Sequence, residues 1–501
     1  MKSEVTLTAV GLAGIAVLVG QMYAGARPDR GAAPVEYGYA TSGGIAGGGV
    51  PDVAVCDMPN WVKHGVVGSI TAYSFGTTSV NVGTANLDWI DGSPFHPVIS
   101  QNMFRLKDGK FEHIGQSWLK HGFCALQLSG CGPCAVQGGC PSFLKPGCRD
   151  PYSAGLNGSQ GGLGPKFEVN AATGVFRWPY TADGVGGNTI YKRLQVATAD
   201  LANPGALYFI EGQYVALDDA AAGNGNNNAS YRRVNISSGS HNLSFVGLTQ
   251  QQDPAIQAWK DQDPSVSLVN IDVANDGRFI LGYKATDLGG GIWHYEYALQ
   301  NLNSDRSGQS FSVPIPGGVT VTNEGFHDVF YHSGEPYDGT DWPVIVGGGT
   351  VSWSTQDFST NVNANALRWG TMYNYRFDAD SPPTSVAVEV GLFKPGTPVS
   401  VIGHALGPTE PITNSPDLNG DGCTDSKDLT ILLGAWCSAV NDPNPPSPPC
   451  ENCTQANLDS ADIAGAGQGP PDGCVDSSDL TKLLGGWCSA AGGNPCGTCP
   501  P

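Results

Sequence analysis

A pattern of acidic residues, glycine and cysteine that occurs twice near the C-terminus constrains this chain more than any other feature. Residues 417–428 read Asp-Leu-Asn-Gly-Asp-Gly-Cys-Thr-Asp-Ser-Lys-Asp, and residues 472–479 read Asp-Gly-Cys-Val-Asp-Ser-Ser-Asp. Each copy leads into an apolar run, and in the first copy Leu429, Leu432 and Trp436 have the spacing of a helix with one buried face. The repeat predicts two loop–helix units in a small C-terminal module.

The first copy has the spacing of a calcium-binding loop. Ca²⁺ takes about six to eight oxygen ligands, and a loop that wraps around it needs a glycine at its sharp turn. Gly422 stands at that turn, which is position 6. The predicted ligands are Asp417, Asn419, Asp421, Asp425 and Asp428 through their side chains, and Cys423 through its backbone carbonyl. We therefore expect Ca²⁺ as the cofactor of this module.

The second copy departs from this spacing in its first half. Its predicted ligands are Asp472, Cys474, Asp476 and Asp479. Straight alignment puts Gln468 and Pro470 at positions 1 and 3, where the first copy has Asp and Asn. Alternatively, Asn457 and Asp459 supply these oxygens across an insertion of residues 460–471, since a longer loop costs little additional closure entropy. Both alternatives remain open from the sequence.

Eight of the 14 cysteines are distributed evenly over the two copies. They form the spaced pairs Cys423/Cys437 and Cys474/Cys488 and the close pairs Cys450/Cys453 and Cys496/Cys499. A cysteine at loop position 7 predicts a disulfide to the end of the following helix, which would staple a very small unit. Zinc binding by the Cys-x-x-Cys pairs is the alternative.

The Asp-Gly-Cys loop followed by a Leu-Leu-Gly-x-Trp helix resembles the dockerin type I family, in its cysteine-containing GC-type variant, over residues 416–501. The resemblance implies two calcium loop–helix units packed about a pseudo-twofold axis. It also implies docking onto a cohesin-like or cell-surface protein, so that the module tethers the upstream domains. Aspartate at position 12, in place of the usual EF-hand glutamate, is compatible with this family.

The N-terminus and the cysteine content predict export. Lys2 precedes an apolar run from Val5 to Val19, and Ala24-Gly25-Ala26 forms a signal-peptide cleavage pattern, so we assign residues 1–26 to a signal peptide and residues 27–50 to a Gly-rich linker. The alternative is that this apolar run stays uncleaved as an N-terminal membrane anchor. If it is cleaved, we expect no membrane span in the mature chain. Fourteen cysteines indicate an oxidising, extracytoplasmic location. A net charge of −20 argues against nucleic acid as a partner.

The remaining chain predicts a mainly β fold. Short β-like runs broken by Gly, Asn and Pro indicate a β-rich, cysteine-containing domain over residues 51–261, whose six cysteines allow fifteen pairings. Alternation of Tyr295, Tyr297 and Leu299 with polar neighbours, and of apolar residues over 386–392, indicates a β-sandwich over residues 262–406. We expect a β-sandwich-rich body of one or two domains, followed by the small α-helical, disulfide-containing dockerin-like module at residues 407–501.

The densest ionisable cluster of the body spans residues 324–341, with Tyr337 and Trp342 interleaved. Its candidate catalytic residues are His327, His332, Glu335 and Asp338. Such a group can bind a metal or act as general acid and base beside sugar-stacking aromatic rings, or it is simply an acidic loop at a sandwich edge. A second oxygen-rich stretch, residues 211–228, is a candidate calcium or carbohydrate site or a set of turns.

Three functions fit these patterns. The first is an exported calcium-binding protein that docks through its C-terminal module and whose body binds extracellular polysaccharide. The second is a glycan-active hydrolase or lyase, and the third is a structural surface-layer protein. The chain lacks a complete catalytic motif of a P-loop, dinucleotide-binding or zinc-protease type, which favours the first.

Overall fold

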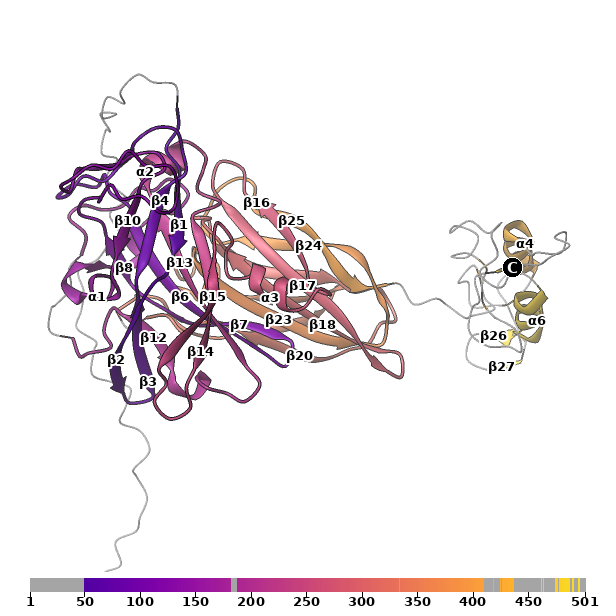
Figure 1. Cartoon of the computed structure of the whole chain (residues 1–501). Coiled ribbons are helices and arrows are strands. Elements are labelled where there is room, and N and C mark those ends of the chain that lie inside the picture. Colours follow the sequence, from indigo (N-terminus) through magenta and orange to yellow (C-terminus); the bar gives the residue numbers. More distant parts are fainter. Residues whose placement is uncertain are drawn as a thin grey trace, which may run out of the picture. The chain divides into compact units, whose positions relative to one another are not determined.

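The computed structural model describes residues 49–181, 187–332 and 334–409, together with parts of the stretch between residues 418 and 495. The predicted signal peptide and nearly all of the predicted linker lie outside the described residues. The body is mainly β, as predicted, and its sheets are antiparallel (Figure 1). No helix among the described residues is long and apolar enough to span a bilayer.

The first half of the body contains a large antiparallel sheet. Its main path follows the order β15-β14-β13-β6-β7-β12-β3-β2, and β8 and β11 extend it beside β6. The strands are β2 (Trp61–Val67), β3 (Ile70–Phe75), β6 (Val98–Lys107), β7 (Lys110–Gln116), β8 (Leu119–His121), β11 (Leu163–Gly164), β12 (Leu194–Ala197), β13 (Leu207–Val215), β14 (Ala229–Ile236) and β15 (Leu243–Gln250).

Smaller elements cover this sheet. A three-stranded sheet has the order β1-β4-β10, and β5 pairs with β9. These strands are β1 (Val53–Asp57), β4 (Thr77–Asn81), β10 (Arg149–Tyr152), β5 (Leu87–Asp88) and β9 (Phe143–Leu144), and the helical turns are α1 (Ala154–Asn157), η1 (Gln160–Gly162), η2 (Lys166–Glu168), η3 (Thr198–Asp200), α2 (Leu217–Ala221) and α3 (Gln257–Gln262).

The second half consists of two five-stranded sheets, as the predicted β-sandwich requires. Their orders are β16-β17-β18-β23-β20 and β21-β22-β19-β24-β25. The strands are β16 (Ser267–Asp272), β17 (Arg278–Gly289), β18 (Ile292–Asn301), β19 (Gly308–Pro314), β20 (Val321–His327), β21 (Val344–Gly347), β22 (Thr350–Ser354), β23 (Thr371–Ala379), β24 (Pro383–Leu392) and β25 (Ser400–Pro408).

Aromatic side chains from both sheets fill the sandwich. Tyr297 of β18 lies 5.4 Å from Phe311 of β19 between ring centroids, and Phe311 lies 4.6 Å from Tyr375 of β23. Because alternate residues of a strand point to opposite faces, the predicted alternation at Tyr295, Tyr297 and Leu299 places these three fully buried side chains in one core.

The central strands β6 and β13 are buried on both faces. Successive side chains of each strand point to opposite faces and so enter two different cores. Met103 and Ile210 point into the core of the first half, whereas the neighbouring Phe104 and Phe209 point into a core shared with the second half. Met372 of β23 belongs to that shared core. The two β-rich halves are therefore packed against each other through a continuous apolar layer.

Three disulfides hold the cysteine-rich loop of the first half. They join Cys56 to Cys131, Cys124 to Cys140, and Cys134 to Cys148. Cys131 and Cys134 therefore belong to different bonds, which excludes a redox Cys-x-x-Cys pair at this place. Three disulfides in one body indicate an oxidising environment.

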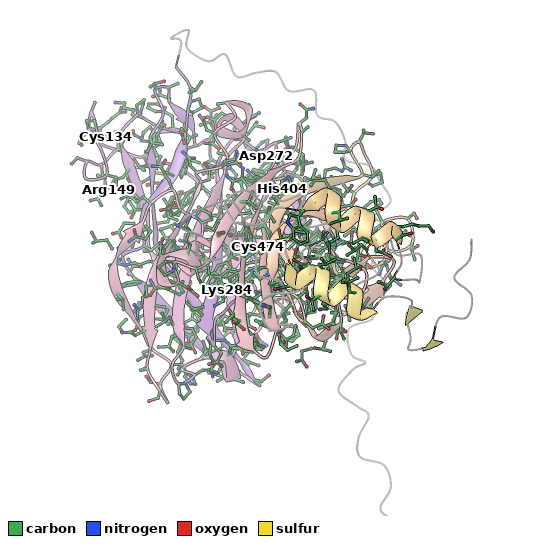
Figure 2. The ribbon with its side chains drawn as sticks, turned by 90° about the vertical axis from the view of Figure 1, so that its right-hand side faces the viewer. Cys134, Arg149, Asp272, Lys284, His404 and Cys474 are labelled. Atoms are coloured by element: carbon green, nitrogen blue, oxygen red, sulfur yellow. A yellow bond between two sulfur atoms is a disulfide. The ribbon has the colours of Figure 1, made fainter. Side chains whose placement is uncertain are left out.

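In the C-terminal region the structure describes two helices, α4 (Ser426–Ala435) and α6 (Ser477–Gly486), and two short strands, β26 (Ser489–Ala490) and β27 (Asn494–Pro495). The helices lie side by side, as both views show (Figures 1 and 2). Leu432 and Leu483 are fully buried between them together with Val475 and Ile463. Packing each helix through one apolar face gives this small unit its own core.

Candidate functional site

The predicted calcium ligands fall partly within the described residues. Asp428, Cys474 and Asp479 are described, whereas Asp417, Asn419, Asp421, Cys423, Asp425, Asp472 and Asp476 lie outside the described residues. Cys474 is disulfide-bonded, which leaves its backbone carbonyl as its oxygen donor. The predicted bond between Cys423 and Cys437 also lies outside this part. Within the described residues, no three His, Cys, Asp or Glu side chains form a metal-binding group.

Asp428 and Asp479 occupy matching places in the two repeats. Each lies in the first turn of its helix, each is fully buried, and each accepts a backbone N–H bond of 2.6 Å, from Leu418 and Ile463 respectively. A carboxylate is favoured at a helix N-terminus because the helix dipole is positive there. Position 12 therefore ties the beginning of each loop to the following helix.

These contacts indicate how the second loop aligns with the first. Asp428 and Asp479 differ by 51 in number, as do the buried pair Leu432 and Leu483, whereas Leu418 and Ile463 differ by only 45. The second loop therefore carries six additional residues, because 51 minus 45 is six. In sequence, the residue before Ile463 is Asp462, which stands where the first loop has Asp417. Neither alignment made from the sequence selected Asp462.

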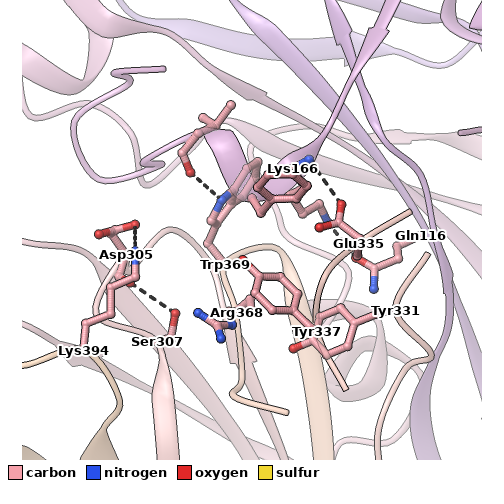
Figure 3. A pocket seen from close by; sticks show the side chains of 12 residues that line it. Gln116, Lys166, Asp305, Ser307, Tyr331, Glu335, Tyr337, Arg368, Trp369 and Lys394 are labelled. Atoms are coloured by element: carbon pink, nitrogen blue, oxygen red, sulfur yellow. Dashed lines mark hydrogen bonds and ion pairs between the residues drawn. The ribbon is translucent and has the colours of Figure 1, made fainter. Parts of the chain in front are cut away.

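The body contains a pocket of about 370 Å³, part of it open to solvent, between the two β-rich halves (Figure 3). Its lining is Gln116, Lys166, Phe167, Val169, Asp305, Ser307, Tyr331, Glu335, Tyr337, Arg368, Trp369 and Lys394. Much of this space is open solvent, and the cavity itself is about 30 Å³. It therefore admits a small polar group rather than a whole ligand. Of the four candidate catalytic residues, only Glu335 belongs to this lining.

Two glycines allow the chain to form this pocket. Gly334, next to Glu335, has a φ of +98°, and a Cβ there would lie 2.9 Å from the Trp118 ring. Gly370, after Trp369, has a φ of +67°, and its N–H bonds to the Asn301 carbonyl at 2.7 Å. A left-handed backbone is strained for other residues. These two turns place Glu335 and Trp369 at the junction of the halves.

The Glu335 carboxyl is shielded from solvent although the residue as a whole is half-buried. Its Oε1 accepts the backbone N–H of Lys166 at 3.3 Å, and its Oε2 is buried without a hydrogen-bond partner. Burial raises the pKa of Glu335 to about 7, against the opposing effect of the Lys166 charge. A carboxyl that is half-protonated near neutral pH is suited to proton transfer or to hydrogen bonding with an anion.

Lys166 is a buried cation beside this carboxyl. Its Nζ donates to Gln116 Oε1 at 3.1 Å and to the Gly370 carbonyl at 3.4 Å, and it lies 5.3 Å from the Trp369 ring centroid. Burial lowers the pKa of Lys166 to about 8, while Glu335 and Glu211 act in the opposite direction. Lys166 therefore remains largely charged at neutral pH.

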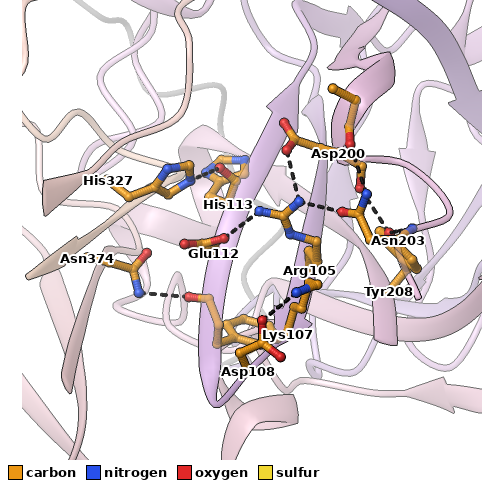
Figure 4. Close-up of polar contacts among 12 residues, drawn as sticks. Arg105, Lys107, Asp108, Glu112, His113, Asp200, Asn203, Tyr208, His327 and Asn374 are labelled. Carbon is orange, nitrogen blue, oxygen red and sulfur yellow. Dashed lines mark hydrogen bonds and ion pairs between the residues drawn. The ribbon is translucent and has the colours of Figure 1, made fainter. Parts of the chain in front are cut away.

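The other candidate catalytic residues make backbone or turn contacts. His327 Nε2 lies 3.3 Å from the His113 carbonyl (Figure 4), and His332 Nε2 lies 2.8 Å from the Arg193 carbonyl. Asp338 accepts from the Thr340 N–H at 3.1 Å and from Asn361 Nδ2 at 2.9 Å. These contacts link neighbouring segments, and they leave Glu335 as the candidate that a pocket ligand can reach.

The region around His327 also contributes charge at the junction. Glu112 accepts from Arg105 Nη2 at 2.7 Å (Figure 4). The pKa of Glu112 is lowered although burial alone would raise it, because the charges of His327, Arg105 and Arg376 outweigh that effect. Asn374 Nδ2 donates to the Phe111 carbonyl at 2.9 Å beside this group. These contacts fasten the two halves to each other.

Two acidic residues of the second oxygen-rich stretch make hydrogen bonds within the fold. Asp219 accepts from the Val53 N–H at 2.9 Å and from Asn228 Nδ2 at 2.7 Å. Glu211 lies in the core, where its Oε2 accepts from the Ala255 N–H at 2.6 Å. The carboxylates of Asp219 and Glu211 are therefore hydrogen-bonded within the chain, whereas Asn227 Oδ1 and Asn228 Oδ1 are buried without a hydrogen-bond partner.

Sequence reasoning missed Gln116, Lys166 and Arg368. Each stands in a different part of the chain, and none belongs to a motif with a characteristic spacing. Only the pairing of the two halves brings them to Glu335.

Comparison with known protein families and with curated proteins finds no match to this chain.

Proposed function

We propose that this chain is an exported calcium-binding protein that docks through its C-terminal dockerin-like module to a cohesin-like or cell-surface partner, and that its β-rich body binds extracellular polysaccharide. One observation carries the docking proposal: the buried Asp428 and Asp479 make the same 2.6 Å bond to the start of their loops. Two equivalent loop–helix units are the arrangement that a duplicated calcium module requires.

Two further observations support the proposal. The three disulfides of the body are suited to an extracytoplasmic protein, which agrees with the signal peptide expected at residues 1–26. The pocket at Glu335 has an aromatic and polar lining that can receive a small polar group of a ligand.

Calcium binding is tested by calorimetric titration of Ca²⁺ into the full chain with its cysteines oxidised. We expect two sites, with Asp428→Asn and Asp479→Asn each weakening one of them by at least about tenfold, because each removes a charged oxygen from position 12. Lys482→Gln, on α6, is the matched control and should leave both sites unchanged. An absence of calcium uptake by the unmodified chain would refute the proposal.

The alignment of the second loop is tested in the same assay. Asp462→Ala is expected to weaken the second site, whereas Gln468→Ala and Asn457→Ala should have little effect. A loss of calcium only in Asn457→Ala would contradict the six-residue insertion.

Docking is tested by retention of extracellular proteins on the immobilised full chain, with Ca²⁺ or with EDTA. The proposal predicts a partner that is retained only with Ca²⁺ and is lost when Asp428→Asn and Asp479→Asn are combined. Retention that is equal in both conditions would count against calcium-dependent docking.

A second function, that of a glycan-active hydrolase or lyase, is favoured by one observation. The Glu335 carboxyl, with a pKa of about 7, lines a pocket in a manner typical of a general acid or base. This function predicts product release from an extracellular polysaccharide, with loss of activity in Glu335→Gln and retention in Asp338→Asn. Equal activity in both variants would exclude Glu335 from the reaction.

A further inference from the structure

The pocket at Glu335 carries a local excess of positive charge in a strongly acidic chain. Its charged lining consists of the cations Lys166, Arg368 and Lys394 and the carboxyl groups of Asp305 and Glu335. Lys394 Nζ and Asp305 Oδ1 form an ion pair of 2.7 Å and largely compensate each other. Two cations then face one carboxyl, although the whole chain has a net charge of −20.

Neither of these two cations has a carboxylate partner at ion-pair distance. Over the part of the chain that the structure describes, no acidic oxygen lies within 4.0 Å of Lys166 or Arg368 side-chain nitrogens. Arg368 is 7 % exposed, and its Nη2 donates to the carbonyls of Val362 and Ala364 at 3.1 and 3.2 Å. Its guanidinium also stacks on Tyr337, 4.0 Å from the ring centroid. The chain thus positions Arg368 rigidly without neutralising it.

Two polar atoms of the lining residues are buried without a hydrogen-bond partner. They are Arg368 Nε, a donor, and Glu335 Oε2, which accepts when ionised and donates when protonated. A buried polar atom without a hydrogen-bond partner is destabilising. An anionic oxygen is a suitable acceptor for Arg368 Nε, and it also accepts from the Glu335 carboxyl when that group is protonated.

The shape of the arginine side chain favours one kind of anion. The lining has one net positive charge when Glu335 is ionised and two when it is protonated, so it attracts an anion in both states. A carboxylate is singly charged and planar, and it matches the planar guanidinium of arginine.

We propose that this pocket binds the carboxylate of a uronic acid unit in an acidic polysaccharide, with Arg368 and Lys166 as the recognising cations and Glu335 as a hydrogen-bond donor. The choice of a carboxylate rests on the pocket itself. The choice of a sugar rests on the proposed polysaccharide-binding function.

Binding is expected to depend on pH. The charged groups that act on Glu335 are Lys166 and Glu168 on η2 and Arg368 before β23, and Tyr337 and Tyr331 are the other titratable groups of the lining. A rising pH removes the proton of Glu335 at about 7 and then that of Lys166 at about 8. Both changes disfavour an anion, so affinity should fall about tenfold between pH 6 and pH 8.

The test is calorimetric titration of the full chain, in saturating Ca²⁺, with trigalacturonic acid and with its fully methyl-esterified form. We expect the acid to bind and the ester to bind at least tenfold more weakly. Arg368→Gln should weaken the acid at least tenfold, whereas Arg278→Gln, whose guanidinium pairs with Asp272 outside the pocket, should not. Glu335→Gln should bind with an affinity that falls only about twofold between pH 6 and pH 8, because Lys166 alone then loses its proton over this range.

Control variants and control ligands distinguish failure of this inference from failure of the proposed function. A melting curve confirms that Arg368→Gln is folded; if it is not, Arg368→Lys and Glu335→Gln carry the test. Equal affinity for acid and ester, or for neutral cellotriose, would overturn the uronate proposal and leave polysaccharide binding in place. Equal affinity for acetate would overturn the sugar assignment. Absence of binding to any saccharide would refute both.

Discussion

The replacement Glu335→Gln should change how the stability of this protein depends on pH. In the unfolded chain this carboxyl ionises near 4.5, whereas in the folded chain burial raises its pKa to about 7. Between these pH values the folded state binds more protons than the unfolded state, so the free energy of unfolding falls as pH rises. Glutamine is nearly isosteric and cannot ionise, and the variant should therefore lack this contribution.

The size of the effect follows from the pKa difference. A rise of the Glu335 pKa from 4.5 to about 7 lowers the free energy of unfolding by about 3 kcal/mol at pH values well above 7. About 2.5 kcal/mol of this decrease occurs between pH 5 and pH 8. The difference in unfolding free energy between Glu335→Gln and the unmodified chain should grow by that amount over this range. Asp150 and Asp219 also have a pKa raised to about 7 by burial, but they act equally on both proteins.

Urea unfolding followed by tryptophan fluorescence at pH 5, 6.5 and 8 measures this difference. Of the 11 tryptophans, only Trp436 and Trp487 lie outside the body, so the signal reports mainly on the body. Glu324→Gln, at an exposed position on β20, is the control and should differ from the unmodified chain by less than about 0.5 kcal/mol at each pH. If the difference in unfolding free energy between Glu335→Gln and the unmodified chain stays constant with pH, burial does not raise the pKa of Glu335 and this prediction is refuted.

Three further predictions concern the fold. Replacing both cysteines of the Cys56–Cys131 bond by serine should lower the free energy of unfolding by about 4 kcal/mol, and the same change at Cys124–Cys140 by about 3 kcal/mol, because the bonds close loops of 75 and 16 residues. Equal losses of unfolding free energy in urea titrations would contradict this dependence on loop length. Phe311→Ala should cost roughly 3–5 kcal/mol in the same assay, since its ring is fully buried between the sandwich sheets, and a loss under about 1 kcal/mol would argue against that packing. Gly334→Ala should cost more than about 1 kcal/mol, as its φ is +98°, and a neutral change would show that the turn before Glu335 tolerates a side chain.

The candidate site was only partly accessible from the sequence. Glu335 belongs to a dense local cluster of ionisable residues and was selected for that reason, together with His327 and His332. Clustering in sequence does not specify where each side chain points, however. His327 and His332 contact the carbonyls of His113 and Arg193 instead of lining the pocket. The cations that face Glu335 come from other parts of the chain and carry no motif.

Local periodicity and residue chemistry determined the mainly β body, the burial of Tyr295, Tyr297 and Leu299, and the oxidising environment indicated by many cysteines, because each of these depends only on neighbouring residues or on composition. Tertiary structure alone decided which of fifteen cysteine pairings forms, which core receives Met103 and which receives Phe104, and where Glu335 meets Lys166 and Arg368. These outcomes depend on contacts between segments far apart in the chain. The alternation of apolar and polar residues in a strand predicts that one face is buried, but it does not predict which segment packs against that face.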